Sequence, residues 1–132
     1  MNGVSFPMLW AIAIGGAAGS VSRYLVSVWM PRPVGAFPLS TFVINVTGSF
    51  LIALFARTLG TPDSNPVLRA ALTIGFCGGF TTFSTFSAEF VTLVQEGRTA
   101  RAVLYVVASV LTSVLAVLAG LAVGQRFIAA RG

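Results

Sequence analysis

Long apolar segments alternate with short polar connections along the whole chain. Four segments hold roughly the 20 apolar residues that a helix needs to cross a bilayer core, and they cover about residues 8–30, 39–58, 68–94 and 101–123. Prolines mark the first two connections, and the polar run from Gln95 to Arg98 marks the third. The pattern therefore predicts an all-α membrane protein that crosses the bilayer four times.

The composition supports a chain embedded in a membrane. Of the 132 residues, 56% are hydrophobic and 8% are charged, and the mean hydropathy is +0.93. Soluble domains use roughly 25% charged residues, so a water-soluble fold of this size would lack the polar residues to cover its surface. We expect a single transmembrane domain over residues 1–132, surrounded by the lipid bilayer. The first segment follows no arginine or lysine and is longer than a signal-peptide core, so we expect it to be retained.

The third segment contains a run of weak helix formers, Gly78-Gly79-Phe80-Thr81-Thr82-Phe83-Ser84-Thr85-Phe86. Water cannot replace lost backbone hydrogen bonds at mid-membrane depth, so a helix can break there only where protein covers the break or the break lines a cavity. We therefore predict a third helix that is broken near mid-membrane. Its exposed ends would offer carbonyl groups to a cation and amide groups to an anion.

Three polar residues lie where hydrocarbon makes them costly. Asn45 is about a third of the way into the second segment, so its amide either bonds another helix or faces a water-filled path. Arg23 precedes the end of the first segment by seven residues, and it either reaches an aqueous vestibule or snorkels to the interface. Glu89 is the only acid inside an apolar segment, so we expect it to be protonated, paired or close to the interface.

Two rows of side chains indicate a polar path. Tyr105, Ser109 and Ser113 follow one another at four-residue steps, so their hydroxyl groups share one face of the fourth helix. These serines either line a path or bond their own backbone carbonyls. Phe83 and Phe86 are three residues apart and share a face if the chain is helical there. Because phenyl rings have a positive edge, two such edges can contact a small anion, although packing is the commoner role of phenylalanine.

The charges are balanced between the two sides of the predicted bundle. All eight cations are arginines that stand singly between apolar runs, which indicates interfacial anchors and no nucleic-acid partner. One side carries Arg57, Arg69, Arg126 and Arg131, and the other carries Arg32, Arg98 and Arg101, with Arg23 added if it snorkels that way. Such a balance sets no preferred orientation, so two copies inserted in opposite directions could pair antiparallel. A single orientation fixed by lipid or by the insertion machinery is the alternative.

Glycine spacings and the lack of catalytic groups narrow the function further. GxxxG patterns favour close helix packing without identifying the partner helix. They occur at Gly15 and Gly19, at Gly75 and Gly79, and at Gly120 and Gly124. The chain has no histidine, and no nucleophile occurs together with paired carboxylates, so we do not expect an enzyme.

Three stretches of the sequence resemble the small fluoride channels of the Fluc or CrcB family. These stretches are Gly15–Tyr24, Thr41–Phe50 and Gly75–Glu89, and the third is the most specific of them. The resemblance implies one channel domain that lets fluoride leave the cell passively across the cell (inner) membrane, which lowers fluoride toxicity. It also implies an antiparallel, dual-topology homodimer with two pores, each lined by both subunits.

The same resemblance implies roles for individual residues. Phe83 and Phe86 resemble pore phenylalanines whose ring edges meet fluoride, and Asn45 resembles the amide that donates to it. The hydroxyl groups of the pore would come from Thr41, Tyr105, Ser109 and Ser113, and Arg23 would be the vestibule arginine. The carbonyl groups of Gly78 and Thr81 would hold a structural sodium ion at the dimer centre, and this ion would not be transported.

Two other functions compete with the channel. Small four-helix, dual-topology exporters of drugs or metabolites are similar in size and charge balance, but they rely on an acid within the first span, and none occurs between Met1 and Arg57. A non-transporting accessory subunit would explain the GxxxG spacings. It would leave the broken third helix and the aligned hydroxyl groups without a purpose.

Overall fold

The computed structural model describes residues 5–130, which form an all-helical bundle. Arg131, which entered the charge balance, lies outside the described residues. The helices are α1 (Phe6–Trp29), α2 (Leu39–Thr58), α3 (Pro66–Ala70), the π-helical η1 (Ala71–Cys77), α4 (Gly78–Phe80), α5 (Phe83–Gln95) and α6 (Thr99–Ala129).

Four units within residues 5–130 are long and apolar enough to cross a membrane, which confirms the predicted all-α protein with four spans. The third unit, Pro66–Gln95, consists of α3, η1, α4 and α5 taken together. The fourth helix is longer than its apolar segment, because α6 has 31 residues and continues past residue 123 to Ala129. Helix formation does not require apolar side chains, so the polar Gln125 and Arg126 continue it beyond the hydrophobic run.

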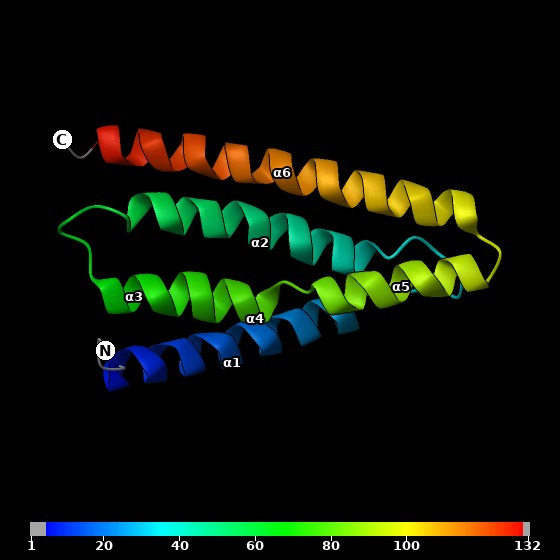
Figure 1. Ribbon diagram of the computed structural model, residues 1–132, viewed down its shortest axis with the longest axis horizontal. Coiled ribbons are helices and arrows are strands. Elements are labelled where there is room, and N and C mark those ends of the chain that lie inside the picture. Colours follow the sequence, from blue (N-terminus) through cyan, green and yellow to red (C-terminus); the bar gives the residue numbers. More distant parts are fainter. Residues whose placement is uncertain (1–4, 131–132) are drawn as a thin grey trace.

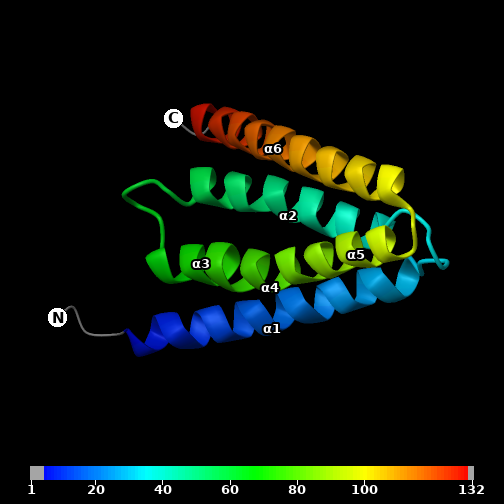
Figure 2. The same cartoon turned by 45° about the vertical axis from the view of Figure 1, so that its right-hand side comes forward.

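The four spans lie side by side in the order α6, α2, third span, α1, as Figure 1 and the turned view of Figure 2 both show. α2 packs most extensively on α6, whereas α1 packs mainly on η1 and α4. The third span therefore lies between α1 and α2. The start of α1 and the end of α6 lie at the same end of the bundle (Figure 1).

Glycines allow the helices to approach closely on both sides of the bundle. A Cβ atom added to Gly75 would lie 2.7 Å from the carbonyl oxygen of Ile12 and 3.1 Å from the Cα of Gly15. A Cβ atom added to Gly120 would lie 3.0 Å from the Cβ of Ala53. Larger residues would push these helices apart. The GxxxG spacings thus join α1 to the third span and α6 to α2.

The third span is interrupted at two threonines. The backbone leaves the helical region at Thr81 (φ −75°, ψ 160°) and Thr82 (φ −152°, ψ 114°), and α5 begins at the next residue. Thr82 then caps α5, because its Oγ1 accepts a hydrogen bond from the backbone nitrogen of Thr85 at 3.1 Å. This geometry is consistent with the predicted break near mid-membrane.

The glycine pair that drew attention to this run is itself helical. Gly78 and Gly79 belong to the turn of α4, and a Cβ atom on Gly79 would lie 3.1 Å from the Cα of Gly16 in α1. Gly79 therefore serves helix packing, while the threonines form the break. The preceding π-helical turn η1 was not expected from the sequence.

A small core lies at the end of the bundle near the α1–α2 and α5–α6 connections. Leu93, Ala102 and Tyr105 are fully buried there. Four phenylalanines pack against them: Phe37, Phe42, Phe86 and Phe90. Many other large apolar side chains are exposed, which is the expected state for side chains that face lipid.

Candidate functional site

Asn45 of α2 bridges the break in the third span with two hydrogen bonds. Its Nδ2 donates to the Thr82 carbonyl at 3.1 Å, and its Oδ1 accepts from the Thr82 amide at 2.8 Å. In a continuous α-helix the Thr82 amide would donate to the carbonyl of Gly78, so Asn45 replaces that lost partner. The interhelical hydrogen bond considered for Asn45 is therefore present. One Nδ2 hydrogen is used, and the second is left for another acceptor.

Polar side chains of α1 cover the other face of the break. Nη1 of Arg23 donates to the Thr81 carbonyl at 3.3 Å, and Oγ of Ser20 donates to the Gly79 carbonyl at 3.5 Å. Arg23 is therefore bound to the interrupted backbone at its predicted depth in the bundle. Its positive charge lies beside carbonyl groups that the break has exposed.

The two carbonyls expected to hold sodium differ in their surroundings. The Gly78 carbonyl has lost its helical donor, because the Thr82 amide donates to Asn45. The Thr81 carbonyl accepts from Arg23, which competes with a cation for it. Hard cations are held by several oxygen ligands, so two carbonyls from one chain form at most part of a site. A second copy of the chain would have to complete it.

A cavity of about 460 Å³ lies between α2, the break and α6. Six of the residues singled out from the sequence line it: Asn45, Thr81, Phe83, Phe86, Ser109 and Ser113. They come from three spans that are far apart in the sequence. The remaining lining includes Gly48, Ile52, Val110 and Val114, so the cavity is largely apolar with a few polar groups. Such a lining is typical of a selective site for a small ligand.

The two predicted pore phenylalanines share a face of α5, and their ring centroids are 5.6 Å apart. Phe83 is 80% exposed at the edge of the cavity. Phe86 is partly buried, and its ring centroid lies 5.0 Å from that of Tyr105. Phe86 therefore also packs in the core, whereas Phe83 has little packing within one chain.

The serines of α6 can be compared with a neighbouring threonine. Oγ of Ser109 is buried and has no hydrogen-bond partner among residues 5–130. Oγ1 of Thr112, by contrast, donates to the carbonyl of Ala108 on its own helix. Thr112 thus bonds a backbone carbonyl of its own helix, the alternative considered for the serines, whereas Ser109 does not. A buried hydroxyl without a partner on a cavity wall is able to bind a ligand.

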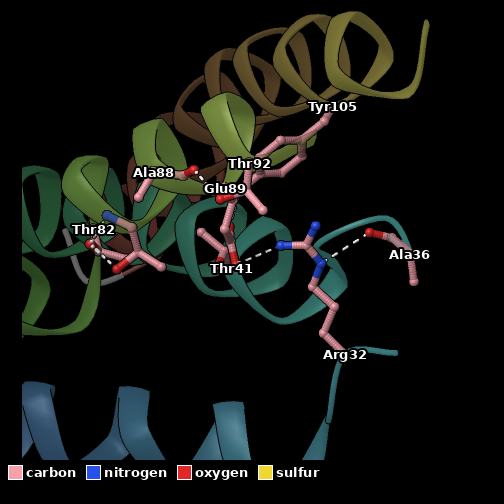
Figure 3. Close-up of polar contacts among 9 residues, drawn as sticks. Arg32, Ala36, Thr41, Thr82, Ala88, Glu89, Thr92 and Tyr105 are labelled. Carbon is pink, nitrogen blue, oxygen red and sulfur yellow. Dashed lines mark hydrogen bonds and ion pairs between the residues drawn. The ribbon is translucent and has the colours of Figure 1, made fainter. Parts of the chain in front are cut away.

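Tyr105, the first residue of the hydroxyl row on α6, belongs to a separate polar cluster around Glu89 (Figure 3). The hydroxyl of Tyr105 donates to Oε2 of Glu89 at 2.8 Å, and Oγ1 of Thr41 donates to Oε1 at 3.1 Å. Nη1 of Arg32 lies 3.8 Å from the same Oε1. Of the states considered for Glu89, the paired one is therefore present in the structure.

A second cavity of about 320 Å³ lies on the α1 side of the break. Arg23 and Thr41 line it, together with several hydroxyl-bearing residues: Ser20, Tyr24, Ser27, Thr82 and Thr85. Thr82 also lines the larger cavity, so the two cavities share this residue. Arg23 faces a polar space here, which agrees with the vestibule interpretation. Its role in permeation stays a prediction.

Sequence reasoning missed two features of the site. Arg32 was interpreted only as an interfacial anchor, although it pairs with Glu89 across the bundle. Thr82 was noticed only as part of the weak helical run, although its backbone and side chain make the bonds that shape the break. The one available signal for the ion pair was a lone acid inside the apolar segments of a chain with eight arginines.

Comparison with known proteins identifies the family. The family described as "CrcB-like protein, Camphor Resistance (CrcB)" matches residues 10–121, which is most of the chain. The chain belongs to the CrcB-like family. This result confirms the resemblance seen in the sequence.

Relatives within the CrcB-like family cover almost the whole chain. A protein of Acidobacterium capsulatum named "Fluoride-specific ion channel FluC" is 46% identical over 123 residues, which is 92% of this chain and 98% of the relative. A protein of the same name from Rhizobium meliloti is 47% identical over 119 residues, or 89% and 95% of the two chains. "Fluoride-specific ion channel FluC 1" of Nitrobacter hamburgensis is 44% identical over 120 residues, again 89% and 95%.

These relatives decide two of the sequence-based expectations. They are named as ion channels and not as enzymes, so the expectation that this CrcB-like chain is not an enzyme is confirmed. Four spans together with these relatives make it a multi-pass membrane protein. The drug exporter and the accessory subunit receive no support from the family.

Proposed function

We propose that this protein is a fluoride-specific ion channel of the cell (inner) membrane that lets fluoride leave the cytoplasm and so lowers its toxicity. One observation carries the proposal. In a chain whose relatives are named fluoride channels, a single cavity gathers Asn45, Phe83, Phe86, Ser109 and Ser113 from three different spans. These are five of the seven pore residues that the family resemblance implies, and the other two, Thr41 and Tyr105, do not line this cavity.

The chemistry of the cavity suits a small, strongly hydrated anion. Such an ion gives up its water only where other groups replace the lost hydrogen bonds. The free hydrogen on Nδ2 of Asn45 and the unpartnered hydroxyl of Ser109 are available as donors. The ring edges of Phe83 and Phe86 add weak positive potential without a fixed charge, so the ion is not trapped.

Passive movement fits the state of the only acid inside an apolar segment. Glu89 accepts two hydrogen bonds and pairs with Arg32, so both of its oxygens are already bonded within the protein. We therefore propose that fluoride moves down its own gradient without a coupled proton.

We propose that the functional unit is an antiparallel, dual-topology homodimer with two pores. Phe83 lies at the edge of the cavity and is 80% exposed, so one chain alone leaves the path open on one side. A second copy packed there would close it and would add its own residues to each pore. The balance of arginines between the two sides allows the opposite orientations that such a pair requires.

A structural sodium ion at the dimer centre is the last part of the proposal. The Gly78 carbonyl has lost its helical donor, and with Thr81 and the same two groups of a second copy it would provide four carbonyl oxygens. Replacing sodium by potassium in the buffer should then lower the midpoint of thermal unfolding by several degrees. Equal midpoints in the two salts would exclude a sodium ion that stabilises the fold.

An efflux assay tests the channel proposal. Purified protein is reconstituted into liposomes loaded with potassium fluoride or potassium chloride, and release is followed with ion-selective electrodes after valinomycin is added. We expect fluoride to be released and chloride to be retained. Equal release of both anions, or fluoride release that requires a proton gradient, would overturn the proposal.

A further inference from the structure

Arg32 lies in the α1–α2 connection and points toward α5 (Figure 3). Its Nε donates to the carbonyl of Ala36 at 3.0 Å, which fixes the guanidinium group against the connection's own backbone. Its Nη1 then lies 3.8 Å from Oε1 of Glu89. The side chains of Arg32 and Glu89 are only 21% and 16% exposed, so solvent screens this pair less than an ordinary surface pair.

Glu89 lines neither cavity itself, but it bonds one residue that lines the smaller cavity and one residue of the hydroxyl row. Its two oxygens accept from Thr41, which lines the smaller cavity, and from Tyr105, which precedes Ser109 in the row on α6. The ring of Tyr105 also contacts that of Phe86, a lining residue of the larger cavity. An anion that approaches either hydroxyl therefore comes close to a carboxylate.

A bare carboxylate at this point would obstruct an anion path. Like charges a few ångströms apart repel strongly where water is scarce. The positive guanidinium of Arg32 compensates the negative charge of Glu89, so the ion pair carries no net charge. The pair also leaves Glu89 able to accept from Thr41 and Tyr105, so the acid orients both hydroxyl groups while its charge is compensated.

We infer that Arg32 is a positioning residue of the fluoride path, which neutralises Glu89 so that fluoride can pass the hydroxyl groups of Thr41 and Tyr105. This inference rests on the proposed function and adds to it a residue on the α1–α2 connection. It assigns Arg32 an electrostatic task, separate from holding the connection in place.

The structure offers a matched control for the anchoring role. Nη1 of Arg98 donates to the carbonyl of Gly35 in the same connection at 3.1 Å, and Arg101 also bonds this carbonyl. Arg98 makes an ion pair of its own with Glu96 at 3.4 Å. Arg98 thus shares the residue type, the anchoring contact and the pairing of Arg32, but its partner is Glu96 and not Glu89.

The test is a double-mutant cycle in the liposome efflux assay. The variants are R32Q, R32K, E89Q, the double variant R32Q/E89Q, and the control R98Q. Thermal unfolding and gel filtration check that each variant folds and associates as the wild type does. We expect R32Q to lower fluoride efflux by at least about tenfold, because it leaves Glu89 uncompensated. R32K should retain efflux within about threefold of wild type, because it restores the charge.

The cycle separates charge compensation from anchoring. Efflux by R32Q/E89Q should recover to the level of E89Q, and R98Q should conduct as the wild type does. Wild-type efflux in R32Q, or a double variant no better than R32Q, would overturn the inference. A loss in R98Q equal to that in R32Q would also overturn it, since both would then act by anchoring the connection. Wild-type liposomes without fluoride efflux would instead refute the proposed function itself.

Discussion

The side-chain amide of Asn45 forms two hydrogen bonds with the main chain of Thr82. Its Nδ2 donates to the Thr82 carbonyl at 3.1 Å, and its Oδ1 accepts from the Thr82 N–H at 2.8 Å. An asparagine side chain has the same donor and acceptor groups as a peptide bond, so it can take the place of a missing helical neighbour. The pairing explains how a helix can stop inside an apolar segment without leaving this backbone amide unbonded.

Asn45→Asp tests this pairing together with the anion path. Aspartate keeps an acceptor for the Thr82 amide, but it loses the donor to the Thr82 carbonyl and adds a negative charge to the cavity. We expect fluoride efflux to fall by at least about tenfold and stability to fall by about 1–3 kcal/mol, with the gel-filtration profile of the wild type retained. Liposome efflux and thermal unfolding measure the two effects.

Asn65→Asp is the matched control for that substitution. Oδ1 of Asn65 caps α3 by accepting from the backbone nitrogens of Val67 and Leu68 at 2.9 and 3.2 Å. Aspartate caps a helix about as well as asparagine. Efflux and stability should therefore remain at wild-type levels. A large loss of efflux in this control would show that any added acid impairs the protein.

Phe83→Ile should impair conduction without impairing folding. Phe83 is 80% exposed within one chain, so little packing inside that chain is lost, and we expect the folding stability of a single chain to change by no more than about 0.5 kcal/mol. Isoleucine has no positive ring edge to face an anion, so efflux should fall by about tenfold or more. Phe127→Ile on α6, where the ring is 55% exposed, is the control. Equal efflux in both variants would remove Phe83 from the path.

Ser109→Ala removes a hydroxyl that bonds no other protein group in the described part of the chain. No hydrogen bond is lost, so the thermal midpoint should stay within about 2 °C of wild type, while fluoride efflux should drop by about three- to tenfold because a donor on the cavity wall is gone. Thr112→Val is the comparison, since its hydroxyl bonds the Ala108 carbonyl of its own helix. Unchanged efflux in Ser109→Ala would count against this hydroxyl as a ligand.

Gly75→Ala and Gly78→Ala form a pair that separates packing from helix propensity. A Cβ on Gly75 meets the backbone of α1 at 2.7 Å, whereas a Cβ on Gly78 has no atom within 4 Å among the described residues. We expect the first change to destabilise the protein by about 1–3 kcal/mol. The second should be neutral or stabilising by up to about 1 kcal/mol, as alanine favours helix. Unfolding midpoints in detergent measure both.

A destabilised Gly78→Ala variant would contradict that expectation in an informative way. Nothing among residues 5–130 would meet the added methyl group. The clash would then have to come from a second copy of the protein. Cross-linking of the variant would show whether association is the step that fails.

Sequence patterns predicted the features of this protein that depend on many residues at once. Four spans follow from apolar runs, and their signal averages over about 20 positions each. The existence of a break in the third helix was predictable, because weak helix formers cluster in that span. Its exact position within the run was not, because Gly79 stays helical and packs closely on the backbone of Gly16, a contact that no local propensity describes.

The polar contacts of the site were predictable only in part. Periodicity placed Ser109 and Ser113 on one face, and both line the cavity with Asn45 and Phe86. The same row placed Tyr105 with them, yet its hydroxyl is bonded to Glu89. The partners of Glu89 include Arg32, whose position depends on the path of the α1–α2 connection. The sequence does not predict that path, because short loops show little periodicity.

The length of α6 has a consequence for the surrounding membrane. Its 31 residues extend for about 46 Å at the α-helical rise, whereas the hydrocarbon core is only about 30 Å thick. The helix must therefore tilt or extend its last turns, which hold Gln125 and Arg126, beyond the hydrocarbon core. Because α2 packs along α6, any change in tilt would be passed to the helix that carries Asn45. Bilayer thickness thereby becomes a variable that acts on the anion path from outside the protein.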